Sequence, residues 1–515
     1  MRFGLNATIS FACVASLTAF ASGEVKAADH HQDQEAKGPT VTVYSTADPA
    51  GFDPQRFIAQ QRLGYDPNYA WQVPGFAVVK QVRAVDLEEG VNTWRITDVA
   101  QFIDPTTVSV VDLSDGEAAT VVEQSFEFDL VSPSKLLEKF TDREITVYVP
   151  AGDHINAVTG KLLSSNQGRL VLSTDDGLRI VDATHQLKLG DLPDGLITQP
   201  TLVWQIFAPK AGERRMRTAY QTEGVTWRAD YNLILNEDDT AADLGAWVSL
   251  MNLSGATWEN AQLKLIAGDV QRVEQRPQLD YMRGRLAMEG APAGFEEKAF
   301  FEYHLYTLPR RVDIATNTTQ QITLFPTVQD VPVERRLVYY GASGNYGFFP
   351  DPMTDRNFGV QSNTKIDVYI RFENDEASGL GRPMPRGKVR VYKADDADGS
   401  LEFIGEDLID HTPRNETLLV KVGQAFDVVG ERTQTDFTSN LAQREMTESI
   451  EIKLRNHKDE AVNVLVKENL YRWSNWEIVN ASHEFEKMDV RTIHFDVPVE
   501  SDGESVVTYT VRYWW

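Results

Sequence analysis

The chain has 515 residues, a length that corresponds to about three domains at roughly 150 residues per domain. Hydrophobic residues make up 42% and charged residues 24%, which excludes the collagen-like, coiled-coil and helical polytopic membrane classes. The 76 acidic residues outnumber the 50 basic ones, and the formal net charge is −26. Because this charge repels phosphate backbones, we expect no nucleic-acid partner.

Residues 1–27 have the features of a secretory signal peptide. One basic residue, Arg2, precedes an apolar run over residues 7–21 that is too short to span a bilayer comfortably. Small side chains place the cleavage site within Ala21–Ala28, and we favour cleavage after Ala27. Export of this kind predicts a periplasmic or secreted protein.

The mature chain is expected to begin with a flexible linker and to lack thiol chemistry. Residues 28–38 are polar and have no periodicity, which is typical of a linker. The one cysteine, Cys13, lies inside the signal peptide, so we expect neither disulfides nor cysteine-ligated metal. No later stretch approaches 18 consecutive apolar residues, which predicts a mature chain without a transmembrane helix.

Residues 39–195 are predicted to form an N-terminal β-rich region. From Val41 onward, β-branched or aromatic residues alternate with polar ones, which is the period of a half-buried strand. Two proline-containing caps, Asp53-Pro54 and Ser132-Pro133, each precede an apolar stretch and predict short helices. Short strands separated by tight turns fill residues 143–192, a rhythm typical of a small SH3-like barrel.

Beyond residue 195 the predicted strands are longer and richer in aromatic residues. Residues 196–445 are expected to form a β-sandwich-like core, and residues 446–515 a C-terminal immunoglobulin-like β domain. Three predicted strands end in an asparagine, at Asn252, Asn374 and Asn456, a residue that readily bonds nearby backbone. The sequence therefore predicts a mainly β fold of several antiparallel sandwich-like or barrel-like domains with two or three short helices.

Spaced tryptophan, glycine and asparagine residues recur in several stretches, which in chain order are Gly224–Tyr231, Asn252–Gly268, Glu302–Tyr306 with Gln320–Ile322, Gly381–Tyr392 and Tyr509–Trp515. Together these stretches resemble a known family, the domain of unknown function 4139. The resemblance covers roughly residues 196–515. Mucoidy inhibitor A-like proteins are similar in their C-terminal region, which implies an envelope or exopolysaccharide context. The family supplies no established reaction and no agreed catalytic residues.

The densest group of metal-capable side chains consists of Glu406, Asp407, Asp410 and His411. Carboxylates and imidazoles of this kind bind divalent cations, although the spacing of these four matches no established site. A solvated acidic loop is the alternative interpretation. We retain the four as metal candidates, assign no catalytic or cofactor-binding residue, and expect no cofactor.

The sequence favours a non-enzymatic binding or scaffolding protein of the cell envelope, with an envelope protein or a polysaccharide as its partner. It contains no His-Glu-x-x-His and no Gly-x-Ser-x-Gly, which removes two common hydrolase mechanisms. A first alternative is an extracytoplasmic saccharide hydrolase that uses two carboxylates. A second alternative rests on the alternation over Val507–Trp515, which resembles the closing strand of an outer-membrane β-barrel.

Overall fold

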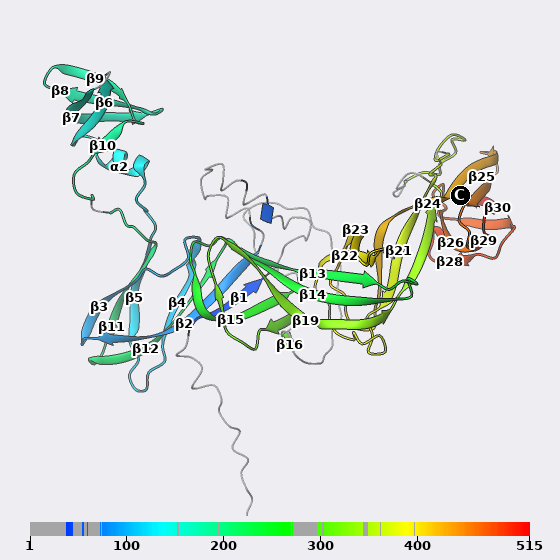
Figure 1. Ribbon diagram of the computed structural model, residues 1–515, viewed down its shortest axis with the longest axis horizontal. Coiled ribbons are helices and arrows are strands. Elements are labelled where there is room, and N and C mark those ends of the chain that lie inside the picture. Colours follow the sequence, from blue (N-terminus) through cyan, green and yellow to red (C-terminus); the bar gives the residue numbers. More distant parts are fainter. Residues whose placement is uncertain are drawn as a thin grey trace, which may run out of the picture. The chain divides into compact units, whose positions relative to one another are not determined.

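The structure is a computed structural model, in which contacts divide the chain into Met1–Lys37 and Gly38–Trp515 (Figure 1). It describes residues 38–44, 75–151, 154–193, 195–268, 303–342, 349–360, 362–395 and 397–515, with positions 54, 55, 59, 73 and 270 and the backbone of 296–300. The expected signal peptide and nearly all of the expected linker lie outside these residues. The expected helix after Asp53 also lies outside them, apart from three helical positions.

The fold is mainly β, as predicted, and the described residues contain one helix with full bounds, α2 (Pro133–Lys139). This helix begins where the sequence predicts it. The Ser132 hydroxyl accepts a hydrogen bond from the Lys135 N–H at 3.2 Å, and Pro133 occupies the first turn. Among the described residues, no helix has both the length and the apolar character needed to cross a membrane.

Strands within residues 40–314 form an eight-stranded sheet and a three-stranded sheet. The larger sheet has the order β16 (Glu296–Phe300), β17 (Tyr303–Thr307), β15 (Trp258–Ala267), β1 (Thr40–Tyr44), β2 (Phe76–Leu87), β12 (Gly212–Thr222), β4 (Ile103–Asp112), and β18 (Val312–Ile314) pairs with β15. The smaller sheet has the order β3 (Gly90–Ile96), β11 (Thr201–Ala208), β5 (Thr120–Glu127). Strands β1 and β15 pair in parallel, whereas the other ladders of these two sheets are antiparallel.

A five-stranded module is inserted between the paired strands β5 and β11 (Figure 1). Its order is β10 (Gln186–Lys188), β6 (Glu144–Ala151), β7 (His154–Asn166), β8 (Arg169–Thr174), β9 (Gly177–Asp182). The strands form an open antiparallel meander where a closed small barrel was expected, because β9 and β10 each pair with one described neighbour. The inserted module has its own core, which includes Leu137 and Phe140 from the α2 region and Leu162, Leu170 and Leu172 from the sheet.

A second five-stranded sheet follows, with the order β19 (Thr318–Pro332), β14 (Ala241–Asn252), β13 (Val225–Leu235), β22 (Gly387–Ala394), β23 (Leu401–Ile409). Its central pair, β13 and β22, is parallel. Its core face contributes Trp227, Tyr231 and Val389 to the cluster that also contains Trp204 of β11 and Leu263 of β15. The second five-stranded sheet, the eight-stranded sheet and the three-stranded sheet therefore share one hydrophobic core.

The C-terminal sheet has nine strands and a separate core. Its order is β27 (Trp476–Ala481), β30 (Glu504–Trp514), β25 (Glu445–Asn456), β24 (Thr417–Asn440), β21 (Lys365–Glu373), β20 (Glu334–Tyr340), β26 (Val462–Asn469), β29 (Thr492–Val499), β28 (Glu486–Lys487). Strands β21 and β24 enter both cores, since Phe372 and Leu418 pack in the first and Ile366 and Val428 in the second. The expected boundary between residues 445 and 446 therefore falls within one sheet.

The three asparagines predicted to end strands do so by bonding backbone from buried positions. Asn252 ends β14, Asn374 follows β21 directly, and Asn456 ends β25. Each side-chain amide donates to a carbonyl of the following loop, to Ala256 at 2.8 Å, to Arg382 at 2.7 Å and to Glu460 at 2.8 Å, respectively. Because the carbonyls would otherwise lie unpaired at a sheet end, these contacts fix the direction in which the chain leaves each strand.

Candidate functional site

The second five-stranded sheet has one face toward the core and an opposite face rich in polar side chains, which we call the polar face. Alternation along β13 creates it, because Trp227, Ala229 and Tyr231 face the core while Arg228 and Asp230 face the other way. Strand register extends it to the neighbouring strands, since directly paired residues share a face. The polar face consists of Arg228, Asp230, Asn232, Gly245, Trp247, Ser249, Lys388, Arg390 and Glu406.

Asp230 is the buried centre of the polar face. Its two carboxylate oxygens accept hydrogen bonds from Arg228 Nε at 3.1 Å, from Ser249 Oγ at 2.6 Å and from Arg390 Nη1 at 3.0 Å. Arg228 Nη2 also lies 3.0 Å from Oδ1, which completes a two-point contact with the carboxylate. Asp230 therefore holds two guanidinium groups in fixed positions on a rigid sheet.

Glu406 is the exposed counterpart of Asp230. Its side chain is 42% exposed and lies 2.8 Å from Lys388 Nζ and 3.5 Å from Arg390 Nε. The hydrogen bond from Lys388 is the main reason that the pKa of Glu406 is lowered, and the charges of Lys388 and Arg390 act in the same direction. Lys388 and Arg390 are thus neutralised within the sheet and face solvent with fixed hydrogen-bonding groups.

Trp247 supplies an exposed aromatic surface next to these charges. It pairs directly with Asp230 across the β13–β14 ladder, and 37% of the residue is exposed. Gly245, two residues earlier on the same face, adds no side chain, and a Cβ there would lie 3.9 Å from Trp247 Nε1. The polar face therefore combines a flat apolar surface with ordered hydrogen-bond donors and acceptors, a combination suited to a ring-shaped polar ligand.

The four residues proposed from the sequence as metal ligands are separated by the structure. Glu406 and Asp407 are consecutive on β23 and point to opposite faces of the sheet. The Asp407 carboxylate accepts the Lys421 backbone N–H at 2.8 Å, and Asp410 lies 2.7 Å from Arg386 Nη2. The remaining candidate, His411, accepts the Arg386 backbone N–H at its Nδ1 at 3.1 Å.

Asp410 behaves as an ion-pair partner of arginine. Burial alone would raise its pKa, but hydrogen bonds from the His411 N–H and from Arg386 outweigh burial and lower it. Within the described ranges, no three His, Cys, Asp or Glu side chains come together in a group that could hold a metal ion. Of the four candidates, the structure thus places Glu406 alone on the polar face.

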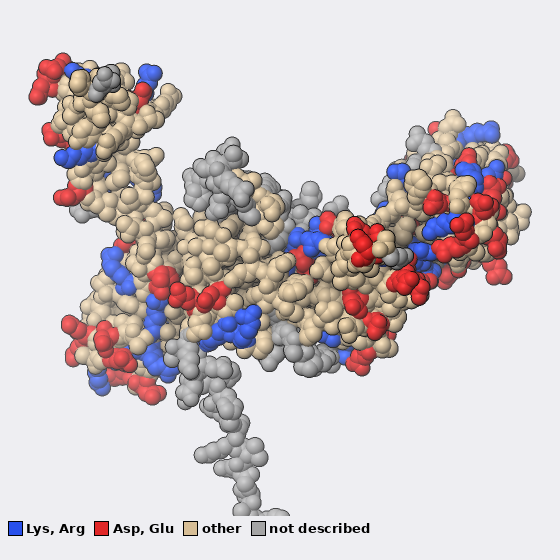
Figure 2. Space-filling view, viewed as in Figure 1, with Lys and Arg blue, Asp and Glu red and all other residues tan. Residues whose placement is uncertain are grey.

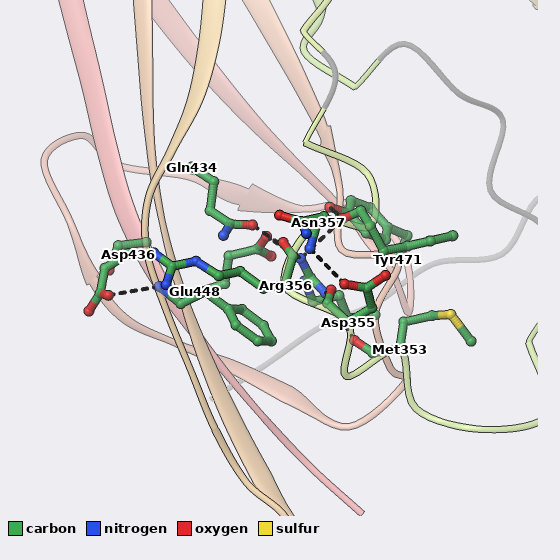
Figure 3. A network of polar contacts seen from close by, with 12 residues as sticks. Met353, Asp355, Arg356, Asn357, Gln434, Asp436, Glu448 and Tyr471 are labelled. Carbon is green, nitrogen blue, oxygen red and sulfur yellow. Dashed lines mark hydrogen bonds and ion pairs between the residues drawn. The ribbon is translucent and has the colours of Figure 1, made fainter.

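A second polar cluster is buried beside the C-terminal sheet, around Arg472. Figure 3 labels Glu448, Gln434 and Asp355 among its members. The Arg472 guanidinium donates to the backbone carbonyls of Met353 at 3.0 Å, Asp355 at 2.7 Å and Phe358 at 3.1 Å. Its Nη2 also donates to Glu448 Oε1 at 3.0 Å, and both side chains are almost completely buried. Arg472 therefore attaches the loop of residues 349–360 to the sheet.

Close packing at Gly359 shows how tightly this loop is held. The backbone φ of Gly359 is +72°, and a Cβ there would lie 2.3 Å from the Tyr471 hydroxyl oxygen. Any other residue at this position would therefore meet both backbone strain and a steric clash.

A neighbouring pair, Arg432 and Glu468, is also buried, and Arg432 Nε lies 2.9 Å from a Glu468 carboxylate oxygen. The Tyr509 hydroxyl donates to the same Glu468 oxygen.

No motif or spacing in the sequence identifies Asp230, Trp247, Arg390 or Arg472 as part of a site. One signal was available in the stretch from Trp227 to Tyr231, where arginine and aspartate are two residues apart in a strand. That spacing places both side chains on one face. Their partners come from β14 and β22, which no local pattern identifies as neighbours.

Comparison with known proteins gives one assignment. No curated protein and no solved structure matches the chain. A family model described as a domain of unknown function matches residues 216–513, which is more than half of the chain. The matched region contains the whole second five-stranded sheet with its polar face and all of the C-terminal sheet except Trp514, the last residue of β30. The chain therefore belongs to the family DUF4139, a domain of unknown function.

Proposed function

We propose that this chain is an exported, non-enzymatic binding or scaffolding protein of the cell envelope, which holds a saccharide on the polar face. The exposed ring of Trp247 beside Gly245, next to side chains fixed by Asp230, is the observation that carries the proposal. An aromatic ring contacts the C–H face of a sugar, while neighbouring polar groups bond its hydroxyls. Export is supported by the signal-peptide features of residues 1–27.

A neutral saccharide fits the charges of the site better than an acidic one. On the polar face, Lys388 and Arg390 already have Glu406 as their partner, and Arg390 also contacts Asp230. The net charge of −26 repels polyanions at long range, for the same reason that it repels nucleic acid. Hydroxyl groups, in contrast, can bond these fixed groups without displacing an ion pair.

Binding is favoured over hydrolysis by the states of the carboxylates. A two-carboxylate glycosidase needs one carboxylic acid whose pKa is raised so that it can protonate the leaving group. On the polar face, Asp230 is occupied by arginine and serine donors, and the pKa of Glu406 is lowered. Neither group has the environment of a general acid.

The proposal is tested with the purified mature chain on a glycan array, combined with an assay for new reducing ends. Retention of a neutral oligosaccharide without release of reducing ends supports it. Release of reducing ends that is lost when one Asp or Glu is substituted would contradict the binding proposal and support the hydrolase alternative. Export is checked separately by cell fractionation, and the cleavage site by mass spectrometry of the mature N-terminus.

A further inference from the structure

The inserted module is a self-contained unit. Its two connecting segments pair with each other, since the Val131 N–H donates to Ile197 at 2.9 Å and the Ile197 N–H donates to Asp129 at 3.1 Å. The chain therefore leaves the β5–β11 ladder and returns to it through one short two-stranded connection. Because the module also has its own hydrophobic core, its surface is available for a role separate from that of the polar face.

Strand β9 is an unprotected edge of the inserted module. It pairs with β8 and with no other described strand, so one row of its backbone N–H and C=O groups has no ladder partner. Ile180 lies opposite Val171 on the outer face, and Leu178 shares that face. Leu178 and Ile180 are 71% and 65% exposed, respectively. An exposed apolar edge is what an added strand requires, and natural proteins ordinarily avoid it.

The charges around β9 define what kind of strand would fit. Exposed carboxylates stand at both ends, Asp175 and Asp176 before the strand and Asp182 at its end. They outnumber the two basic residues beside them, Arg179, which lies 3.9 Å from Asp176, and Arg169, which is opposite Asp182 in the ladder. Figure 2 shows acidic side chains gathered where Figure 1 draws the β8–β9 hairpin. A basic, extended segment is therefore complementary to this edge, and an acidic one is repelled.

We infer that β9 is the docking site for an extended segment of a partner protein, in which apolar residues alternate with basic ones. The segment adds next to β9 as a further strand of the module. Main-chain hydrogen bonds supply the affinity, while Leu178 and Ile180 select apolar side chains on one face and the flanking aspartates select basic ones. This site gives the protein a second, protein-binding surface in addition to the polar face.

Three labelled eight-residue peptides test this inference on the full mature chain by fluorescence anisotropy. The first alternates valine with lysine, the second alternates valine with glutamate, and the third is the lysine peptide with every second amide N-methylated. The lysine peptide should bind at least tenfold more tightly than the other two, because N-methylation removes the ladder donors and glutamate reverses the charge. Amide exchange of Gly177–Asp182 should slow when the lysine peptide binds.

Two variants locate the site. Leu178→Lys combined with Ile180→Lys should abolish binding, whereas the control Ile155→Lys should retain it, because Ile155 is 67% exposed but lies on β7. Equal binding of the N-methylated peptide, equal binding of the glutamate peptide, or full binding by the double variant would overturn the inference. If the double variant unfolds, the relative affinities of the three peptides for the unmodified chain still test the inference.

Discussion

The polar face and the Arg472 cluster are built from the same residue types and differ in their exposure to solvent. In the Arg472 cluster, the side chains of both Arg472 and Glu448 are buried, and the guanidinium donates hydrogen bonds to carbonyls of the neighbouring loop. On the polar face, Arg228, Asp230 and Ser249 are buried, whereas the side chains of Lys388 and Glu406 are 23% and 42% exposed. A buried cluster stabilises the fold, and a half-exposed one can also meet a ligand.

The largest effect on stability is expected at Glu448. Glu448→Gln leaves the buried Arg472 guanidinium without an anion, and breaking such a pair costs about 3–5 kcal/mol. Amide hydrogen exchange of β25 and β30 measures the loss of unfolding free energy in the C-terminal core, to which both strands belong. The matched control is Glu477→Gln, which removes an exposed partner of Arg512 and should cost less than about 1 kcal/mol. Similar losses in both variants would contradict the distinction.

A smaller loss is expected at the centre of the polar face. Asp230→Asn keeps the size of the side chain but removes the charge that Arg228 and Arg390 share, which should cost about 1–3 kcal/mol. Glu406→Gln, on the exposed part of the same face, should cost less than about 1 kcal/mol. Thermal unfolding measures the loss of stability in each variant. A larger loss in Glu406→Gln than in Asp230→Asn would show that Glu406, and not Asp230, is the main stabilising anion of the polar face.

The smallest effect concerns the protonation of Glu406. Because Lys388 lowers its pKa, the side chain should titrate below 4.5, its ordinary value. A lowered folded-state pKa contributes stability above the unfolded value, and this contribution is lost as the pH falls through the folded one. Carboxyl-carbon NMR follows the titration, and Lys388→Met should move the midpoint upward. An unchanged midpoint would show that Lys388 is not the cause.

The parts of the fold that were predictable from sequence are those held by local contacts. Strands of the inserted module follow one another in the chain and pair mostly with their neighbours, so alternation and turn residues indicated them. Ser132 as a helix cap and the strand-ending asparagines were also recognisable, because each acts on backbone a few residues away.

The parts that were not predictable depend on contacts between distant segments. The parallel pairing of β20 with β26 joins Leu337 to Val464, and no periodicity in either strand specifies it. The polar face is likewise assembled from β13 and β22, whose residues Asp230 and Arg390 are 160 positions apart. Candidate ligands chosen by proximity in sequence, such as Glu406 and Asp407, were separated because a strand alternates its faces.

Calorimetric titration of the Trp247→Ala variant with the neutral oligosaccharide that the array retains most strongly tests whether the polar face binds saccharide. We expect at least a tenfold loss of affinity with only a small decrease in the unfolding temperature, because Trp247 is 37% exposed and is not part of the hydrophobic core cluster beneath the sheet. Trp514→Ala is the control, since Trp514 is 41% exposed but lies on β30 of the C-terminal sheet, and it should bind as the unmodified chain does. Unchanged affinity in Trp247→Ala, or an equal loss in Trp514→Ala, would contradict the assignment of the polar face as the ligand site.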